Sequence, residues 1–442
     1  MHTLTNIDRS QWDISSPLHN KLTECDRPIH AWYRFVLSFP PHLVRTYLSK
    51  FGISAGDTVL DPFCGTGTTI VECKKFGISA VGFEANPMAA LASRVKSNWS
   101  IWPSELQRVA RWAAQKAQDE IDEVLDRTQQ TVLSGSREQL TIYGWRTLDV
   151  DAHKLILTDS ISPRPLHRAL VLHRWISAAP SELLEPLQLA LAWTLVVHAG
   201  NIRFGPEVGI TKPKEDCDVV GLWLQQCERM ASDLEVFSDR QNIPTQLIQA
   251  DSRDVSQLPD RSISAVFTSP PYPNEKDYTR TTRLESVVLG LIKNKKDLRA
   301  LKEGLLRSNT RNVYVADRDD QFVADIPEIQ RIAAEIEAKR IFMGKDSGFE
   351  KLYHRVTRLY FGGMARHLES LKPKLVPGAM LGYVVGDQAS YLQIMIRTGQ
   401  LLAEIADRQG YEVVGIDLFR TRIATATRQQ LREEVVLLRW RG

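Results

Sequence analysis

The sequence predicts an α/β fold built on a mainly parallel sheet, and three observations support that prediction. Short apolar runs typical of buried strands alternate along the 442-residue chain with longer segments typical of helices. A glycine-rich turn joins the first of these runs to the helix that follows it. Near the C-terminus two apolar runs follow each other closely, which favours an antiparallel hairpin at the end of the sheet.

The first strand, turn and helix have the spacing of a nucleotide-binding unit. Residues 57–60 (DTVL) are expected to form a strand that ends in Asp61, and a helix is expected over residues 68–76. Gly65 and Gly67 lie in the loop between them. Glycines in such a loop let the backbone come close to a bound ligand, which is why nucleotide sites use them.

An acidic residue strengthens this interpretation. Glu84 follows the expected strand 80–83 (AVGF) and lies 17 positions after Gly67, where about 20 are typical of an acid that binds ribose hydroxyls. The third glycine of a dinucleotide fingerprint is absent. The alternatives at this stage are a dinucleotide site and an ordinary turn.

Before this unit, residues 1–54 contain an aromatic stretch and a helix expected to end at Lys50. Prolines 40 and 41 suit the first turn of that helix. Trp32 and Tyr33 are expected to be core residues. The chain as a whole divides into residues 1–100, an insertion over 101–240, and residues 241–442 with a second helical insertion at about 290–372.

The first insertion is predicted to be largely helical, with an amphipathic stretch at 105–127 and an apolar one at 183–197. A nucleotide-binding fold does not require it, so it is a candidate for substrate recognition. Arg203 and Lys212 lie in its most site-like loop and suit contacts with phosphates and bases. A solvated loop between domains explains the same residues equally well.

The second half begins with strands at 247–250 and 263–267. Asp251 and Ser252 follow the first of these, and Asp251 is expected either to accept a hydrogen bond from an adenine amine or to cap the next helical turn. Residues 269–272 (SPPY) follow the second strand. Prolines fix φ and remove a backbone donor, so this loop is stiff and offers carbonyl groups to a ligand. An ordinary proline-rich turn is the alternative.

Basic and aromatic residues follow this loop. Candidates for nucleic-acid contact are Lys276, Tyr278, Arg280, Arg283 and Arg311, and solvated surface is the alternative for all of them. Helix-turn-helix and zinc-finger spacings do not occur, so sequence reading is expected from loops or from the helical insertion. Strands at 379–387, 411–417 and 434–440 complete the sheet.

Composition limits the classes of protein to consider. Apolar residues make up 43% and charged residues 25%, which is typical of globular chains, and the net charge of +3 indicates a local rather than a global basic face. The five cysteines show no metal-ligand spacing, and reduced thiols are expected. No apolar run is long enough to span a bilayer and no signal-peptide pattern appears, so a cytoplasmic protein without a metal is expected.

The motifs resemble a known family. Residues 61–69 (DPFCGTGTT) with 84–87 (EANP) look like the cofactor motif of amino-methylating DNA methyltransferases. Residues 269–272 are similar to the catalytic tetrapeptide of that family, in the serine-first form commonest among cytosine-N4 enzymes; adenine-N6 enzymes more often carry Asp or Asn there. Transfer RNA guanine methylases share a very similar glycine loop, so that loop alone does not identify the substrate.

The resemblance implies a Rossmann-like class I methyltransferase with a seven-stranded sheet, S-adenosylmethionine as cofactor and a flipped base in double-stranded DNA as substrate. It implies a catalytic role for Ser269, Pro270, Pro271 and Tyr272. The cofactor residues that it implies are Phe39, Asp61, Pro62, Phe63, Gly65, Gly67, Thr68, Thr69, Glu84, Ala85, Asn86, Asp251 and Ser252. A bacterial or archaeal cell is the expected source, and a cognate restriction endonuclease is a candidate partner.

This catalytic role has a physical basis. The lone pair of a nucleobase amine is delocalised into the ring, and two acceptors aimed at its hydrogens redirect that lone pair toward a methyl donor. The Ser269 hydroxyl and the Pro270 carbonyl are expected to be those acceptors. Tyr272 offers a face on which an extruded base stacks. Cytosine-N4 methylation of DNA is therefore the leading prediction. Adenine-N6 methylation, an RNA amino-methylase and a catalytically silent DNA-binding subunit are the alternatives.

Overall fold

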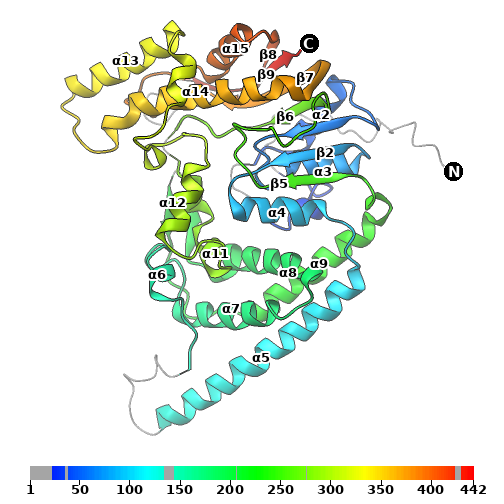
Figure 1. Cartoon of the computed structure of the whole chain (residues 1–442). Helices are drawn as coiled ribbons and strands as arrows, with labels where there is room; N and C mark the ends of the chain where they lie inside the picture. The colour runs from blue at the N-terminus through cyan, green and yellow to red at the C-terminus, as the bar shows by residue number, and fades with distance from the viewer. Residues whose placement is uncertain (1–21, 35–37, 134–143, 206, 275, 424–429) are drawn as a thin grey trace, which may run out of the picture.

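A seven-stranded sheet in the order β5-β2-β1-β6-β7-β9-β8 forms the centre of the computed structural model (Figure 1). The structure describes residues 22–34, 38–133, 144–205, 207–274, 276–423 and 430–442. The strands are β1 (Thr58–Asp61), β2 (Ser79–Phe83), β5 (Thr245–Ile248), β6 (Ile263–Thr268), β7 (Leu375–Gly386), β8 (Glu412–Ile423) and β9 (Gln430–Arg439). Neighbours from β5 to β7 pair in parallel, whereas β9 is antiparallel to both β7 and β8. This confirms the predicted mainly parallel seven-stranded sheet with a terminal hairpin.

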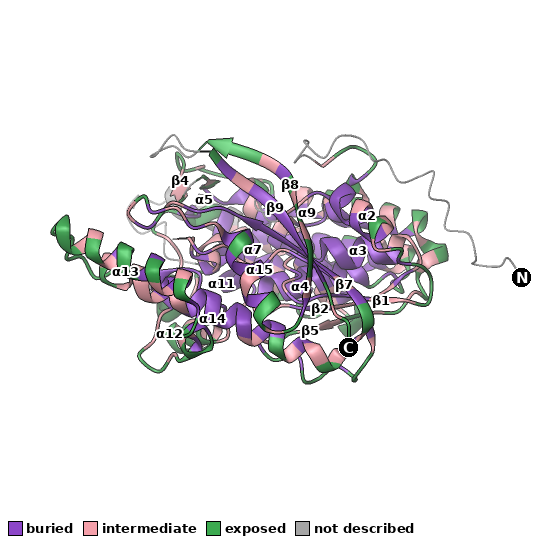
Figure 2. Ribbon diagram, turned by 90° about the horizontal axis from the view of Figure 1, so that it is seen from above, coloured by how far each residue is buried: buried purple, intermediate pink, exposed green. Residues whose placement is uncertain are grey.

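Helices cover both faces of the sheet because successive strand residues point to opposite sides. Val59 packs with α2 (Pro41–Lys50) and α3 (Thr68–Lys75) on one face. Leu60 packs on the other face, in a core shared with α13 (Pro327–Phe342), α14 (Tyr353–Leu371) and α15 (Thr398–Arg408). Figure 2 shows the resulting buried centre and the exposed far end of β8.

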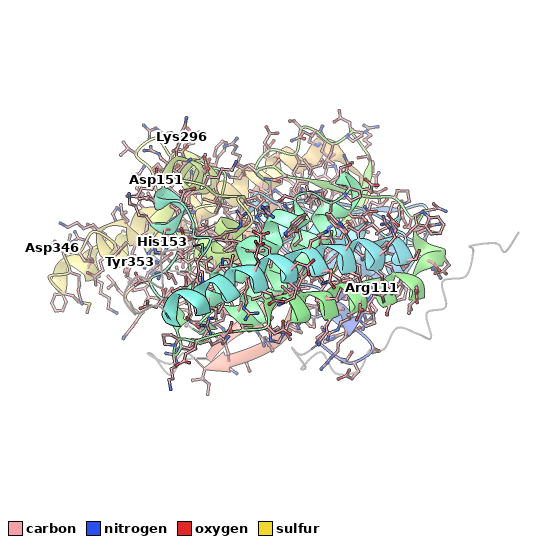
Figure 3. All side chains as sticks on the ribbon, turned by 90° about the horizontal axis from the view of Figure 1, so that it is seen from below. Arg111, Asp151, His153, Lys296, Asp346 and Tyr353 are labelled. Atoms are coloured by element: carbon pink, nitrogen blue, oxygen red, sulfur yellow. The ribbon has the colours of Figure 1, made fainter. Side chains whose placement is uncertain are left out.

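The insertion between α4 (Pro87–Ser97) and β5 is a block of helices that lies below the sheet in Figure 1. Its helices are α5 (Pro103–Leu133), α6 (Val150–His153), α7 (Pro163–Ile176), α8 (Ser181–Thr194) and α9 (Val219–Val236). Of these, α5, α7, α8 and α9 share one hydrophobic core with α4 and Trp32, whereas Ala152 of α6 packs in a smaller separate cluster. Figure 3 shows this block from below, where Arg111 of α5 forms an ion pair with Glu228 of α9 at 3.6 Å.

One detail of the insertion differs from the sequence prediction. A short antiparallel ribbon of β3 (Ile202–Phe204) and β4 (Val208–Ile210) stands where we expected a loop, because strands of three residues are too short to show periodicity.

A buried ionic cluster holds the N-terminal segment against the sheet. Glu72 of α3 accepts hydrogen bonds from Arg45 at 2.6 Å and from His30 at 2.8 Å, and Arg45 also donates to Asp26 at 2.8 Å. Burial lowers the pKa of His30 to about 3, so His30 is neutral in this cluster. The cluster thereby holds residues 26–30 and α2 against α3.

Within the described ranges, no helix is long and apolar enough to cross a membrane. The same residues contain no group of three or more His, Cys, Asp or Glu side chains arranged to hold a metal ion. The five cysteines are not paired with one another.

Candidate active site at the ends of β1 and β6

The two sequence motifs meet at the carboxyl ends of adjacent parallel strands. β1 pairs with β6, and the chain proceeds from β1 to β2 on one side and from β6 to β7 on the other. Ligands of open α/β sheets bind in the crevice at such a switch point. A hydrogen bond joins the two strand ends, because Thr268 Oγ1 donates to Asp61 Oδ1 at 2.6 Å across 207 positions of sequence. Burial raises the pKa of Asp61 to about 6.

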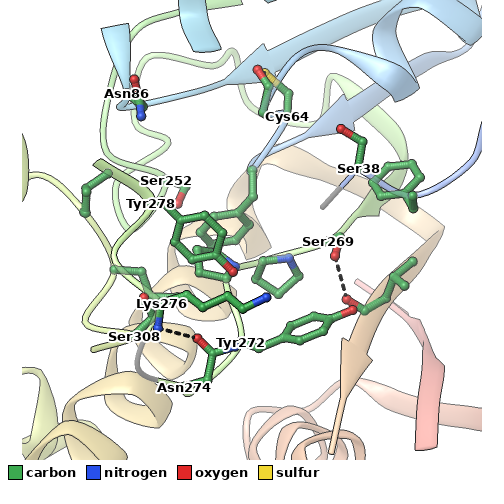
Figure 4. A pocket seen from close by; sticks show the side chains of 18 of the residues that line it. Ser38, Cys64, Asn86, Ser252, Ser269, Tyr272, Asn274, Lys276, Tyr278 and Ser308 are labelled. Carbon is green, nitrogen blue, oxygen red and sulfur yellow. Dashed lines mark hydrogen bonds between the residues drawn. The ribbon is translucent and has the colours of Figure 1, made fainter. Parts of the chain in front are cut away.

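A cavity of about 510 Å³ lies at this point (Figure 4). Its size is within the range of small-molecule sites. The predicted site residues that line it are Phe39, Pro62, Phe63, Gly65, Thr68, Glu84, Ala85, Asn86, Ser252, Ser269, Pro270, Pro271, Tyr272, Lys276 and Tyr278. The structure therefore brings the glycine loop and the SPPY loop to one shared space.

Gly67 allows the glycine loop to turn tightly into α3. It is the N-cap of α3 and has a φ of 83°, in the left-handed region that favours glycine. A Cβ atom at this position would lie 2.6 Å from Ser93 Oγ and 3.2 Å from Ser93 Cα of α4. The loop thus rests directly on α4, and Gly67 supports the cavity wall from behind.

Glu84 lies in the cavity wall at the end of β2. Its Oε2 accepts from the Gly65 amide at 2.9 Å and its Oε1 from the Asn86 amide at 2.8 Å. Each oxygen keeps a lone pair, so the carboxylate is positioned to accept from the hydroxyls of a ribose. Thr66 lines the cavity and Asp61 lies behind its wall, and in the described part of the chain their buried atoms Thr66 Oγ1 and Asp61 Oδ2 have no hydrogen-bond partner. These hydrogen-bonding groups suit a ligand with several polar groups, such as a nucleoside that carries an amino acid tail.

Ser269 and Tyr272 come from the loop after β6. The Ser269 hydroxyl donates to the Val384 carbonyl of β7 at 3.1 Å, which leaves the lone pairs of Ser269 Oγ as acceptors. Tyr272 packs against β7, because a Cβ atom on Gly386 would lie 2.8 Å from the tyrosine ring. Burial raises the pKa of Tyr272, so its phenol remains neutral. Figure 4 shows both side chains in the cavity.

Asp251 is placed differently from the sequence expectation. Both oxygens of its carboxylate accept from Arg253, at distances between 2.6 and 3.0 Å, and Arg253 also pairs with Asp319 at 2.6 Å. Asp251 does not line the cavity, but its neighbour Ser252 does. The Ser252 carbonyl accepts from His367 Nδ1 at 2.7 Å, which fixes this turn.

Among the predicted cofactor residues, Gly67 and Thr69 also lie behind the cavity rather than on its surface; Thr69 Oγ1 donates to the Phe267 carbonyl at 3.2 Å. Arg283 is a correction to the expected nucleic-acid contacts. It is buried, and its guanidinium donates to Thr279 at 2.7 Å and 3.1 Å, so it stabilises the local fold.

The other candidates for nucleic-acid contact lie outside the cavity, with the exception of Lys276 and Tyr278. Arg203 and Lys212 are exposed. Arg280 lies 3.7 Å from Glu207, and the Arg311 guanidinium lies over the Phe349 ring at 5.6 Å.

Sequence reasoning missed several polar residues at the cavity. They are Glu207, Asn274, Ser308, Asn309, Gln388, Ser390, Arg420, Arg422 and Glu433. No motif marks them, since they come from five separate regions of the chain. Gln388 and Ser390 follow β7, so the rule that ligands bind beyond the carboxyl ends of parallel strands was the signal available for these two.

The comparisons with known proteins agree with this geometry. A DNA methylase family model (N6_N4_Mtase) matches residues 6–93. Type II methyltransferase M.BsoBI from Geobacillus stearothermophilus is 25% identical over 321 residues, and Type II methyltransferase M.AvaI from Nostoc sp. (strain PCC 7120) is 21% identical over 434 residues. The chain is therefore similar to amino-methylating DNA methyltransferases.

The extent of each match differs. The alignment with M.BsoBI covers 65% of this chain and 57% of M.BsoBI, whereas that with M.AvaI covers 91% of this chain and 83% of M.AvaI. A shorter match is 44% identical over 56 residues, with the tRNA (guanine(10)-N2)-dimethyltransferase of Methanothermobacter thermautotrophicus, and covers 13% of this chain.

S-adenosylmethionine is the cofactor of this family, which confirms the cofactor predicted from the sequence. The cavity fits it through Glu84, whose carboxylate is free to accept from ribose hydroxyls, and through the polar atoms of the glycine loop. Phe39 and Phe63 add apolar surface to the same cavity.

We expect cofactor binding to weaken as the pH falls through 7. Partial burial raises the pKa of Glu84 to about 7, and ribose hydroxyls donate best to the ionised form. Binding therefore lowers this pKa and releases a proton, and the affinity is expected to be about tenfold weaker at pH 6 than at pH 8. Titration calorimetry in buffers of different ionisation enthalpy measures both quantities. Equal affinity at the two pH values would contradict the assignment.

Glu84→Gln is the matched variant for this experiment, because it cannot ionise. Most of the pH dependence is expected to disappear, and the remainder belongs to Asp61, whose pKa is about 6. In the protein without cofactor, a rise in pH has the opposite effect, because ionisation of Glu84 lowers the stability of the fold. A carboxyl group with a raised pKa destabilises the fold as the pH rises from its ordinary value of 4.5 to about 7, because the charged form is partly buried.

Proposed function

We propose that the protein transfers the methyl group of S-adenosylmethionine to the exocyclic N4 amine of cytosine in double-stranded DNA, with the target base extruded into the cavity. The arrangement of Ser269 is the observation that carries this proposal. Its hydroxyl proton is directed to the Val384 carbonyl, and its lone pairs are available in the same cavity as the glycine loop.

The residues act on the amine in a defined way. Ser269 Oγ and the Pro270 carbonyl accept hydrogen bonds from the amine, so that its lone pair turns away from the ring. Because both acceptors are fixed before the substrate arrives, they need no reorganisation during the reaction. Tyr272 holds the base by stacking. Glu84 and the glycine loop would hold S-adenosylmethionine, which would supply an electrophilic methyl group to the amine.

Two features favour cytosine in DNA over the alternatives. Serine occupies the first position of the tetrapeptide. The two relatives with the longer alignments, M.BsoBI and M.AvaI, are named Type II methyltransferases. Adenine-N6 methylation uses the same chemistry and is the second candidate, since the matching family model covers both amines by name. The match to a tRNA dimethyltransferase is the observation that favours an RNA substrate, although it covers 13% of the chain.

A substrate test separates the two DNA candidates from the RNA candidate. Purified protein is incubated with S-adenosylmethionine carrying a radioactive methyl group and with either plasmid DNA or bulk tRNA. We expect label in the DNA and none in the tRNA, and a label incorporation rate reduced by about 10²–10³ with the Ser269→Ala variant. Label in tRNA alone would overturn the proposed substrate.

A further inference from the structure

Lys276 lies in the cavity, four positions after Tyr272. Hydrogen bonds fix its backbone on both sides: its amide donates to Asn274 Oδ1 at 2.9 Å and its carbonyl accepts from Asn309 Nδ2 at 3.1 Å. Figure 4 shows that its side chain extends across the cavity toward Tyr272. A fixed backbone with an inward side chain is the arrangement of a residue that contacts a ligand.

The ammonium of Lys276 is not neutralised by an ion pair within the described residues. Two carboxylates influence it through space, Glu207 and Glu433. Each of them lies closer to an arginine, with Glu207 at 3.7 Å from Arg280 and Glu433 at 2.6 Å from Arg420. Loss of water contact and the nearby Arg422 lower the pKa of Lys276. A partly desolvated cation of this kind gains from a strong acceptor.

Cytosine and adenine differ in whether they offer that acceptor. On the Watson–Crick edge of both bases, the carbon that carries the amine is followed by a ring nitrogen that accepts a hydrogen bond. The next position is the O2 carbonyl in cytosine and a C2–H group in adenine. A fixed donor opposite this position makes a hydrogen bond with cytosine and faces a carbon-bound hydrogen in adenine.

The direction of the base in the cavity brings O2 toward Lys276. Ser269 and Pro270 hold the amine at the inner end, so the sugar and O2 point toward the mouth of the cavity. Lys276 lines the same cavity as the SPPY loop, and Arg420 and Arg422 line it too. Arg422 is exposed and suits a phosphate of the DNA strand.

We propose that Lys276 selects cytosine over adenine by donating a hydrogen bond from its ammonium to O2 of the extruded base. This rests on the proposed function and adds a group that determines base specificity. A site built to hydrogen-bond one group rejects an analogue that lacks it much more strongly than an apolar site does. Removal of the Lys276 donor therefore reduces discrimination between the two bases.

The test uses the full chain and three synthetic duplexes that contain the methylated site, which is first located by sequencing modified DNA. The target position carries cytosine, adenine or no base. In Lys276→Met, which has a similar length and no donor, we expect kcat/KM for cytosine to fall at least about tenfold, equivalent to about 1.4 kcal/mol. The slow reaction with adenine is expected to be unchanged, as is S-adenosylmethionine affinity measured by calorimetry. Lys296→Met, at an exposed position of α12 (Lys295–Glu303), is the matched control.

The duplex without a target base distinguishes a base contact from a phosphate contact. Its affinity and salt dependence are expected to be the same for wild type and Lys276→Met. Weaker binding, with the slope of log K against log salt reduced by about 0.9, would show that Lys276 holds a phosphate and would overturn the proposal. Equal losses with cytosine and adenine would overturn it as well. A wild-type protein that prefers adenine contradicts the proposed function and the Lys276 assignment together, whereas cytosine preference that persists in Lys276→Met contradicts the Lys276 assignment alone.

Discussion

Ser269→Ala is expected to lower kcat by about 10²–10³, the range observed when one preorganised hydrogen-bonding group is removed from an active site. Alanine removes the acceptor that redirects the lone pair of the amine and leaves the Pro270 carbonyl as the remaining one. The binding of cofactor and DNA is expected to change little, because the hydroxyl contacts neither the glycine loop nor the mouth of the cavity. The Val384 carbonyl loses its donor but borders the cavity, where water can replace it.

Single-turnover methylation with saturating DNA measures this effect, and calorimetry measures cofactor affinity in parallel. Ser264→Ala is the matched control, since Ser264 lies earlier on β6 and its hydroxyl accepts from the Thr58 amide at 3.4 Å, away from the cavity. A Ser269→Ala variant that retains more than about a tenth of kcat, against the 10²–10³ loss expected here, would exclude the proposed role of the hydroxyl.

Gly67→Ala is expected to cause the largest loss of cofactor binding. Left-handed backbone at an alanine costs about 1–2 kcal/mol. In addition, the new methyl group would collide with Ser93, whose Cα would lie at 3.2 Å, so trimming the serine side chain does not relieve the contact. Such overpacking costs about 1–3 kcal/mol and moves the loop away from α4. We expect S-adenosylmethionine affinity to fall at least about tenfold, since the loop carries Gly65 and its hydrogen bond to Glu84.

Gly56→Ala separates the effect of backbone strain from the effect of the collision with Ser93. Gly56 also has a positive φ, of 101°, but a Cβ atom there would meet nothing within 4 Å. Urea unfolding is expected to show a loss of stability in both variants, and calorimetry a loss of affinity in Gly67→Ala only. Unchanged affinity in Gly67→Ala would mean that the glycine loop does not support the cofactor.

The sheet and the glycine loop were predictable because their signals are local. An apolar run of four residues, two glycines and an acid at a fixed distance determine the geometry around Gly65 and Glu84 over fewer than 30 positions of sequence. The SPPY loop was predictable for the same reason. The length of the terminal hairpin was not, because its outer part is rich in arginine and threonine and interrupts the apolar pattern of β8.

The sequence did not predict which ion pairs and hydrogen bonds the charged residues form. Asp251 looked available for an adenine amine, but Arg253 and the distant Asp319 form an ion-pair group with it. Arg283 looked like a DNA contact, but the helices around it bury it. Gln388 reaches the cavity because β7 pairs with β6, and Arg420 because β8 pairs with β9 at the edge of the sheet. Such positions depend on tertiary contacts between segments that are far apart in sequence.

The central claim is the identity of the base that receives the methyl group. Plasmid DNA methylated by the purified protein with isotope-labelled S-adenosylmethionine is digested to nucleosides and analysed by mass spectrometry. The label is predicted in N4-methylcytosine, at a rate about 10²–10³ lower when Ser269 is replaced by alanine. Label in N6-methyladenine would contradict the assignment of cytosine and retain the amine chemistry, whereas label in 5-methylcytosine or in no nucleoside would contradict the whole account.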